Sequence, residues 1–126
     1  MAKKVVFSEY GAADVLQLVD AEIPEPEAGQ VRVRVQAAGL NPLDFKLFGG
    51  MRTSTGSSAA LPSGNGQEFA GVVDALGAEV TTLAVGDNVY GSLPAASQAS
   101  FLVVPAAELS IRPEGVSVEQ AAALHV

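Results

Sequence analysis

The chain has 126 residues, no cysteine and a formal net charge of −7. Apolar residues make up 48% and charged residues 17%, which is typical of one globular domain rather than a disordered segment. The negative charge and the lack of a basic run argue against binding to nucleic acid or to an anionic membrane. The chain has no apolar run of about 18 residues, and its N-terminus lacks the apolar stretch of a signal peptide. We therefore expect a cytoplasmic protein without membrane contact.

Short strands are predicted along the first third of the chain. Lys4–Phe7 and Leu16–Ile23 have the composition or the alternation of strands, and a loop with two prolines and a glycine follows them. The clearest strand runs from Val31 to Gln36, where three valines alternate with two arginines and a glutamine. This alternation puts the valines on one face and the long polar side chains on the other, as in a half-buried antiparallel strand.

The second half has the same character and ends in a short helix. Glu68–Leu76 is predicted to be a strand in which Gly71 marks a bulge or a close backbone approach. We expect a turn at Gly86–Asp87, followed by a strand that ends near Gly91. A further strand is expected over Ser100–Val104, which Pro105 stops, and a helical turn over Ala106–Leu109. Ser117 and Gln120 form a capping-box pattern, which predicts the start of a helix. Six or seven short strands with minor helices predict a mainly β fold, either a barrel or a sandwich.

The segment from Gly49 to Gly66 carries five glycines and many hydroxyl groups. We expect it to form an extended surface loop. Two interpretations stay open for this loop: it covers a substrate cleft, or it is an insertion without a function.

The stretch Ala37–Gly50 interrupts the strand pattern and concentrates polar groups. Gly39 ends the alternation, and Pro42 disfavours a continued strand, so we expect a bend from which Asn41 and Asp44 project. Polar groups on such loops often bind ligands. The alternative is that Asn41 and Asp44 only cap backbone donors.

Several kinds of chemistry find no support in the residues. Gly64-Asn65-Gly66 is followed by Phe69 where a dinucleotide fingerprint needs its third glycine, and a strand follows instead of a helix. A catalytic triad would depend on His125, the single histidine, which stands next to the last residue. Zinc binding is improbable because the chain has no cysteine and this one histidine. Carboxylates are scattered without a metal-binding spacing, at Asp44, Glu68, Asp74, Glu79 and Asp87.

Three motifs together carry a resemblance to a known family. AAGLNPLD, GQEFAGVV and VGDNVYG occur in the order and approximate spacing of the medium-chain dehydrogenase/reductase superfamily. Within it, the chain resembles the N-terminal GroES-like domain of quinone oxidoreductases of the zeta-crystallin type. The resemblance covers nearly the whole chain, and it implies a partly open GroES-like β-barrel over residues 1–126.

The resemblance also implies a zinc-free site. Zinc-dependent alcohol dehydrogenases of the superfamily have a cysteine where this chain has Asn41 and a histidine where it has Gln67. Both positions carry amides here, which are poor zinc ligands, and Glu68 alone would not hold the metal. In the zinc-free branch a hydride passes from NADPH to a quinone or an activated alkene. No metal is therefore expected.

Site roles follow from the same resemblance. Asn41 would lie beside the nicotinamide and the substrate carbonyl as an amide donor, and Asp44 would orient the loop. Lys46, Gln67 and Tyr90 would contact the substrate, and Phe48 would form the outer wall of the cleft together with the Gly/Ser loop. Tyr90 could instead be a barrel residue, and Phe48 could instead fill the core.

The family's Rossmann domain, which carries the cofactor's glycine fingerprint, is expected to be absent from this chain. We therefore expect the substrate-binding half of a reductase that is inactive alone, with an exposed apolar surface that could drive self-association into a homodimer. The alternative is a non-enzymatic GroES-like binding or co-chaperonin-like module, because a fold does not fix a function.

Overall fold

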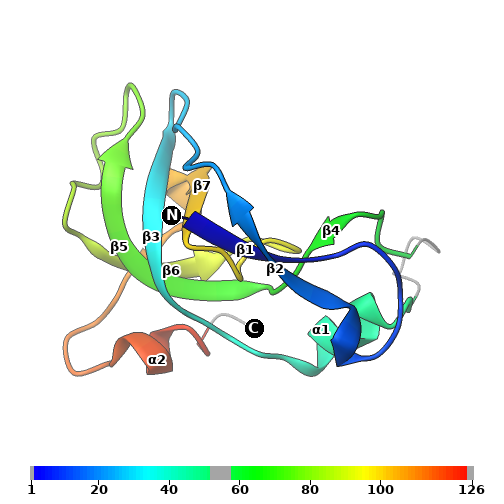
Figure 1. The fold of residues 1–126 in the computed structure, drawn as a ribbon. Coiled ribbons are helices and arrows are strands. Elements are labelled where there is room, and N and C mark those ends of the chain that lie inside the picture. The colour runs from blue at the N-terminus through cyan, green and yellow to red at the C-terminus, as the bar shows by residue number, and fades with distance from the viewer. Residues whose placement is uncertain (1, 52–57, 125–126) are drawn as a thin grey trace.

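The computed structural model describes residues 2–51 and 58–124 and consists mainly of antiparallel strands (Figure 1). A three-stranded sheet has the order β2-β1-β4, and a five-stranded sheet has the order β7-β3-β5-β6-β8. The elements are β1 (Ala2–Phe7), β2 (Leu16–Ala21), β3 (Gln30–Ala38), α1 (Pro42–Phe48), β4 (Ser63–Gly64), β5 (Glu68–Leu76), β6 (Asn88–Ser92), β7 (Phe101–Pro105), β8 (Ser110–Ile111) and α2 (Val118–Ala121), with single 3-10 turns at Ala13–Val15 and Ala106–Glu108. The expected mainly β architecture is confirmed.

The alternation of β3 sets the position of the main core. Val31 and Val33 are fully buried, whereas Arg34 is exposed, as the period-two pattern predicts. The two valines pack with apolar residues of the neighbouring strands, namely Phe69, Val73, Leu83, Val89, Leu102 and Val104. Burial of this cluster is the main force that holds the five-stranded sheet in register.

A bulge lies where β3 passes Gly71 of β5. Val35 pairs with Gly71 and Ala37 with Ala70, so β3 has one residue more than β5 at this point. A Cβ atom on Gly71 would lie 2.2 Å from the backbone oxygen of Arg34. The close backbone approach predicted for Gly71 is therefore confirmed.

The two sheets are joined through the segment that precedes β7. The Val5 N–H donates to the Gln98 carbonyl oxygen at 2.9 Å, and the Ser100 N–H donates to the Lys3 carbonyl oxygen at 2.8 Å. These bonds connect residues more than 90 positions apart and close one side of the molecule. The partly open barrel expected for the fold class results from this connection.

Arg32 contacts side chains of both neighbouring strands on the outer face of the five-stranded sheet. Its Nε donates to Asp74 Oδ1 at 2.8 Å, and its guanidinium lies 5.7 Å from the centre of the Phe101 ring. The hydrogen bond to the Asp74 carboxylate raises the pKa of Arg32.

The structure corrects several predicted boundaries. β1 begins two residues earlier than predicted, β2 ends at Ala21 rather than Ile23, and Pro105 belongs to β7 instead of following it. Proline is tolerated there because β7 is an edge strand of the five-stranded sheet. The short strands β4 and β8 were not predicted, and β4 lies within the segment expected to be a loop. Residues 52–57 of that loop lie outside the described part, as does His125.

α2 begins as the sequence predicts. The Gln120 N–H donates to Ser117 Oγ at 3.0 Å, and the Ser117 N–H donates to Gln120 Oε1 at 2.9 Å, which completes the capping box. Ala121 and Ala122 pack against Ala70 of β5, so the helix lies against the five-stranded sheet (Figure 1). None of the described helices is long and apolar enough to cross a membrane.

Candidate functional site

The stretch expected to bend is a helix. α1 starts at Pro42, with Asn41 as its N-cap residue, and ends at Phe48. The Asn41 N–H donates to Asp44 Oδ2 at 2.9 Å, and the Asp44 N–H donates to the Asn41 carbonyl oxygen at 2.9 Å. The bend predicted over this stretch was wrong because Asn-Pro-x-Asp is a helix-start pattern: proline suits the first helical position and the acid satisfies a free backbone donor. The alternative interpretation, in which Asn41 and Asp44 cap backbone donors, is confirmed for Asp44, whose carboxylate accepts the Asn41 N–H.

The side chain of Asn41 reaches across to β5. Its Nδ2 donates to Glu68 Oε2 at 2.6 Å, and Glu68 is only 2% exposed. A hydrogen bond to a carboxylate is among the stronger ones in proteins, and partial burial strengthens it further. Asn41 is thus fixed both through its backbone, by Asp44, and through its side chain, by Glu68.

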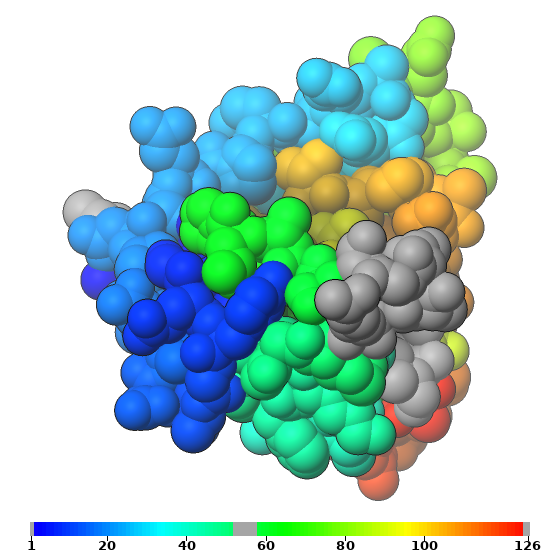
Figure 2. Space-filling model, turned by 90° about the vertical axis from the view of Figure 1, so that its right-hand side faces the viewer, coloured from blue at the N-terminus to red at the C-terminus, as the bar shows by residue number. Residues whose placement is uncertain are grey.

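Three of the predicted site residues line one cavity of about 290 Å³, namely Asn41, Asp44 and Phe48. The other lining residues include Asn65 and Gln98, whose side chains are joined by a hydrogen bond of 2.9 Å from Asn65 Nδ2 to Gln98 Oε1. The rest of the lining is apolar and comes from Leu16, Leu40, Pro42 and Phe45. On the face shown in Figure 2, the residues of α1 lie beside the N-terminal residues and below the segment around β4. A mainly apolar cavity with a few polar groups is typical of a site for a small organic molecule.

Phe48 also belongs to the packed interior. It is 7% exposed, and its ring meets that of Phe7 edge to face at a centroid distance of 6.2 Å. Phe48 therefore closes the inner wall of the cavity, in agreement with the core-filling alternative.

The remaining predicted residues lie outside this cavity. Lys46 is exposed on α1, and Gln67 is 6% exposed just before β5. Tyr90 on β6 is half-buried and packs against the cluster formed by Ala70, Ala121 and Ala122. The structure thus brings Asn41, Asp44 and Phe48 together around one cavity without Lys46, Gln67 and Tyr90.

Sequence analysis missed the contributions of Glu68, Asn65 and Gln98. Glu68 offered one signal, because it is a carboxylate at the start of an otherwise mainly apolar strand. Asn65 and Gln98 are 33 positions apart, and no pattern in the sequence connects them.

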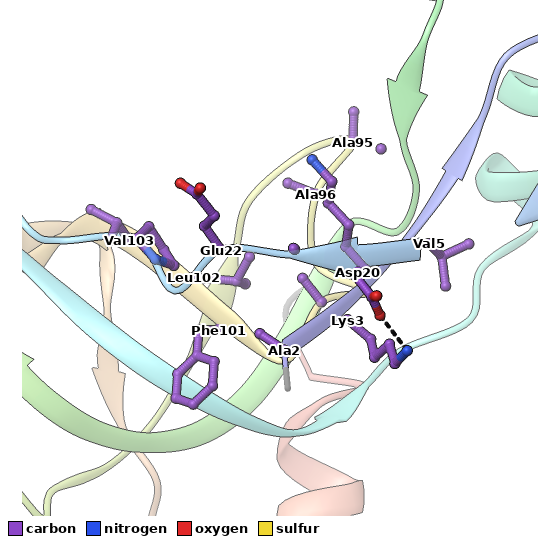
Figure 3. Close-up of a pocket in the computed structure, with 15 residues that line it drawn as sticks. Ala2, Lys3, Val5, Asp20, Glu22, Ala95, Ala96, Phe101, Leu102 and Val103 are labelled. Atoms are coloured by element: carbon purple, nitrogen blue, oxygen red, sulfur yellow. Dashed lines mark hydrogen bonds and ion pairs between the residues drawn. The ribbon is translucent and has the colours of Figure 1, made fainter. Parts of the chain in front are cut away.

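A second and larger cavity, of about 600 Å³, lies between β1, the end of β2 and the inner side of β7 (Figure 3). Five alanines line it together with Val5, Leu102 and Val103, and an ion pair between Lys3 and Asp20 lies at its edge. None of the predicted site residues lines it. Both members of the ion pair are well exposed, and such pairs contribute little energy.

Among residues 2–51 and 58–124, no group of three or more histidine, cysteine or acidic side chains is placed to hold a metal ion. Glu68 contacts the amide of Asn41 instead.

Residues 27–113 match the family model of the alcohol dehydrogenase GroES-like domain, so the chain belongs to this family. A quinone oxidoreductase of Pseudomonas aeruginosa is 41% identical over 125 residues, which cover 98% of this chain and 37% of that protein. The NADPH-dependent alkenal/one oxidoreductase of Arabidopsis thaliana chloroplasts is 36% identical over 132 residues, covering 97% of this chain and 34% of that protein. The crystal structure of Escherichia coli quinone oxidoreductase complexed with NADPH superposes with a TM-score of 0.86 at 30% identity, over 97% of this chain and 36% of that one.

These similarities confirm the resemblance inferred from the three motifs and the GroES-like fold class. They also define the class of protein: an N-terminal domain of the kind found in quinone oxidoreductases of the medium-chain dehydrogenase/reductase superfamily. The chain spans about 37% of the quinone oxidoreductase of P. aeruginosa.

Proposed function

We propose that this chain supplies the substrate-binding half of an NADPH-dependent oxidoreductase that reduces a quinone or an activated alkene. The observation that carries the proposal is the anchored amide of Asn41 at the rim of a mainly apolar cavity. Support comes also from the relatives, whose names specify quinone and alkenal/one reduction.

Asn41 has the chemistry to orient a carbonyl substrate. An amide nitrogen carries two hydrogens, and Glu68 accepts one of them, so one N–H stays available for the oxygen of a quinone or an enone. A fixed donor aimed at an oxygen that gains negative charge stabilises the transition state more than a mobile donor does. Asp44 acts through Asn41, because it holds the backbone at the start of α1.

NADPH would supply the hydride, and Asn41 would lie beside its nicotinamide ring. The residues described here suit only that end of the cofactor. All their strand pairings are antiparallel, so they form no parallel strand-turn-helix unit of the kind that holds dinucleotide phosphates. We therefore assign the phosphate-binding platform to another domain, and we propose that residues 1–126 alone do not reduce quinones.

The roles of Lys46, Phe48, Gln67 and Tyr90 are part of this proposal. The exposed ammonium of Lys46 could contact substrate at the mouth of the cleft, and Gln67 would offer a second amide near Asn41. Phe48 and Tyr90 would shape the site through packing, since both sit in apolar clusters.

A chimera tests the function. This chain would replace the matching 125-residue segment of the P. aeruginosa quinone oxidoreductase, and NADPH-dependent reduction of duroquinone would be followed by absorbance. We expect an active chimera in which Asn41→Ala lowers kcat/KM by about 10²–10³-fold, the loss expected for one donor to a developing oxyanion. Asn88→Ala, which removes an exposed asparagine of β6, is the matched control and should leave the rate unchanged. A folded chimera that binds NADPH but reduces neither duroquinone nor an alkenal would contradict the proposal.

A further inference from the structure

Glu68 is a carboxylate placed almost completely out of water, at 2% exposure. Burial of a carboxylate costs free energy unless the group is hydrogen-bonded, so its hydrogen-bond partners indicate its role. One of its partners is the amide of Asn41, at 2.6 Å. The two residues come from different elements, since Glu68 begins β5 and Asn41 precedes α1.

The backbone between β3 and α1 is shaped to bring these residues together. The Gly39 N–H donates to the Glu68 carbonyl oxygen at 3.0 Å. A Cβ atom on Gly39 would lie 2.5 Å from Glu68 Cγ and 2.7 Å from the carbonyl oxygen of Ala122. Only glycine therefore lets this segment lie directly against the Glu68 side chain.

We infer that Glu68 is a positioning residue, which fixes the amide of Asn41 in the orientation that the proposed reaction uses. This inference rests on the proposed function. Asn41 is half-buried, and without Glu68 its side chain would be free to rotate toward water. With one N–H held by Glu68, the amide plane is set, and the second N–H and Oδ1 point in fixed directions.

Asp44 and Glu68 bind different parts of Asn41. Asp44 Oδ2 accepts the backbone N–H, and Glu68 Oε2 accepts the side-chain N–H. Changes at Asp44 should therefore alter the start of α1 and leave the orientation of the Asn41 side-chain amide unchanged. Changes at Glu68 should alter the orientation of the Asn41 amide and leave the start of the helix unchanged. This contrast distinguishes an effect on the orientation of the amide from an effect on the stability of the fold.

The first test follows the side-chain amide of Asn41 by ¹⁵N NMR in the 126-residue chain, with its signals assigned by their loss in Asn41→Ala. We expect two well-separated proton signals, one of them slow to exchange with water, in the unsubstituted chain and in Asp44→Asn. Glu68→Gln keeps an acceptor oxygen and should retain most of the separation, whereas Glu68→Leu should bring both signals to the values of an exposed asparagine. Backbone signals of β3 and β5 report whether each variant is folded. Unchanged Asn41 signals in a folded Glu68→Leu variant would overturn the inference.

The second test is a double-mutant cycle on the affinity of the chain for duroquinone, a quinone without hydrogen-bond donors. If Glu68 acts through Asn41, then Asn41→Ala and Glu68→Leu each weaken binding about tenfold, and the double variant is no weaker than either single one. Losses that add would overturn the inference. If the Asn41 signals respond to Glu68 as expected but the unsubstituted chain does not bind duroquinone, the orientation of Asn41 by Glu68 stands and the proposed quinone site fails.

Discussion

Gly39 lets the backbone before Asn41 lie against the Glu68 side chain. Its neighbours on one side are a buried carboxylate and a backbone oxygen, neither of which can move freely. We expect Gly39→Ala to lower the free energy of unfolding by about 1–3 kcal/mol, the usual cost of overpacking. Urea denaturation would measure this loss.

Gly91→Ala is the matched control for that substitution. A Cβ atom at Gly91 would first meet a methyl group of Leu109 at 3.0 Å, and this flexible side chain can yield. The loss should therefore be clearly smaller than at Gly39. Equal losses in the two variants would show that the close packing around Gly39 has no special cost.

At the residue scale, the sequence predicted those features that depend on neighbouring positions in the chain. The close approach at Gly71 and the capping role of Asp44 depend on neighbours within a few positions or within one strand pair. The bond between Asn41 and Glu68 spans 27 positions, and it forms only because β3 and β5 pair in one particular register. Nothing in the spacing of the two residues indicates this pairing.

α1 is the element that joins the core to the candidate site. One of its faces buries Phe48 against Phe7, and another leaves Phe45 58% exposed. We expect Phe48→Ala to destabilise the fold by about 3–5 kcal/mol, as for other buried aromatic residues. Phe45→Ala should stay within about 0.5 kcal/mol, as for most surface substitutions, when unfolding is measured at a chain concentration low enough to keep the protein monomeric.

Thermal and urea unfolding of both variants would measure the difference. A small loss for Phe48→Ala would mean that Phe48 is not part of the core and serves the cavity alone. A large loss for Phe45→Ala would mean that the exposed face of α1 is covered in solution.

Prediction was most accurate for the elements whose own residues form a clear pattern. It was least accurate for the elements that form only through contacts with distant parts of the chain. The valine alternation identified β3, and the capping box identified the start of α2. α1 was missed because Asn41, Pro42 and Asp44 were interpreted as turn residues, although the same residue types also start helices. β4 has only two residues, which pair with β1 from a distant part of the chain. A two-residue strand leaves no pattern of its own.

At the scale of the whole molecule, the joining of the two sheets could not have been deduced from the sequence. The bonds between the start of β1 and residues 98–100 are ordinary backbone bonds, with no side-chain pattern that marks them. The family resemblance gave the barrel where local reasoning left a choice between barrel and sandwich.

The exposed apolar surface around α1 predicts self-association. Leu40 is 83% exposed and Phe45 is 58% exposed, and both line the candidate cavity. Large exposed apolar groups of this kind mark surfaces that other proteins or domains cover. We expect sedimentation velocity to show concentration-dependent dimers that the double substitution Leu40→Ser and Phe45→Ser abolishes.

The matched control for self-association is Leu18→Ser. Leu18 is 68% exposed on β2 and does not line the candidate cavity, so this variant should still associate. A chain that stays monomeric at all concentrations would contradict the prediction.

The most direct measurement of the central claim is an NMR titration of the chain with duroquinone, observed at every backbone amide. We predict shifts concentrated at the residues that line the candidate cavity, namely Leu16, Leu40, Asn41, Asp44, Phe45, Phe48, Asn65 and Gln98. Shifts concentrated instead around Lys3, Asp20 and Glu22, at the larger cavity between the sheets, would place the ligand elsewhere and contradict the account. An absence of shifts at saturating duroquinone would contradict it equally.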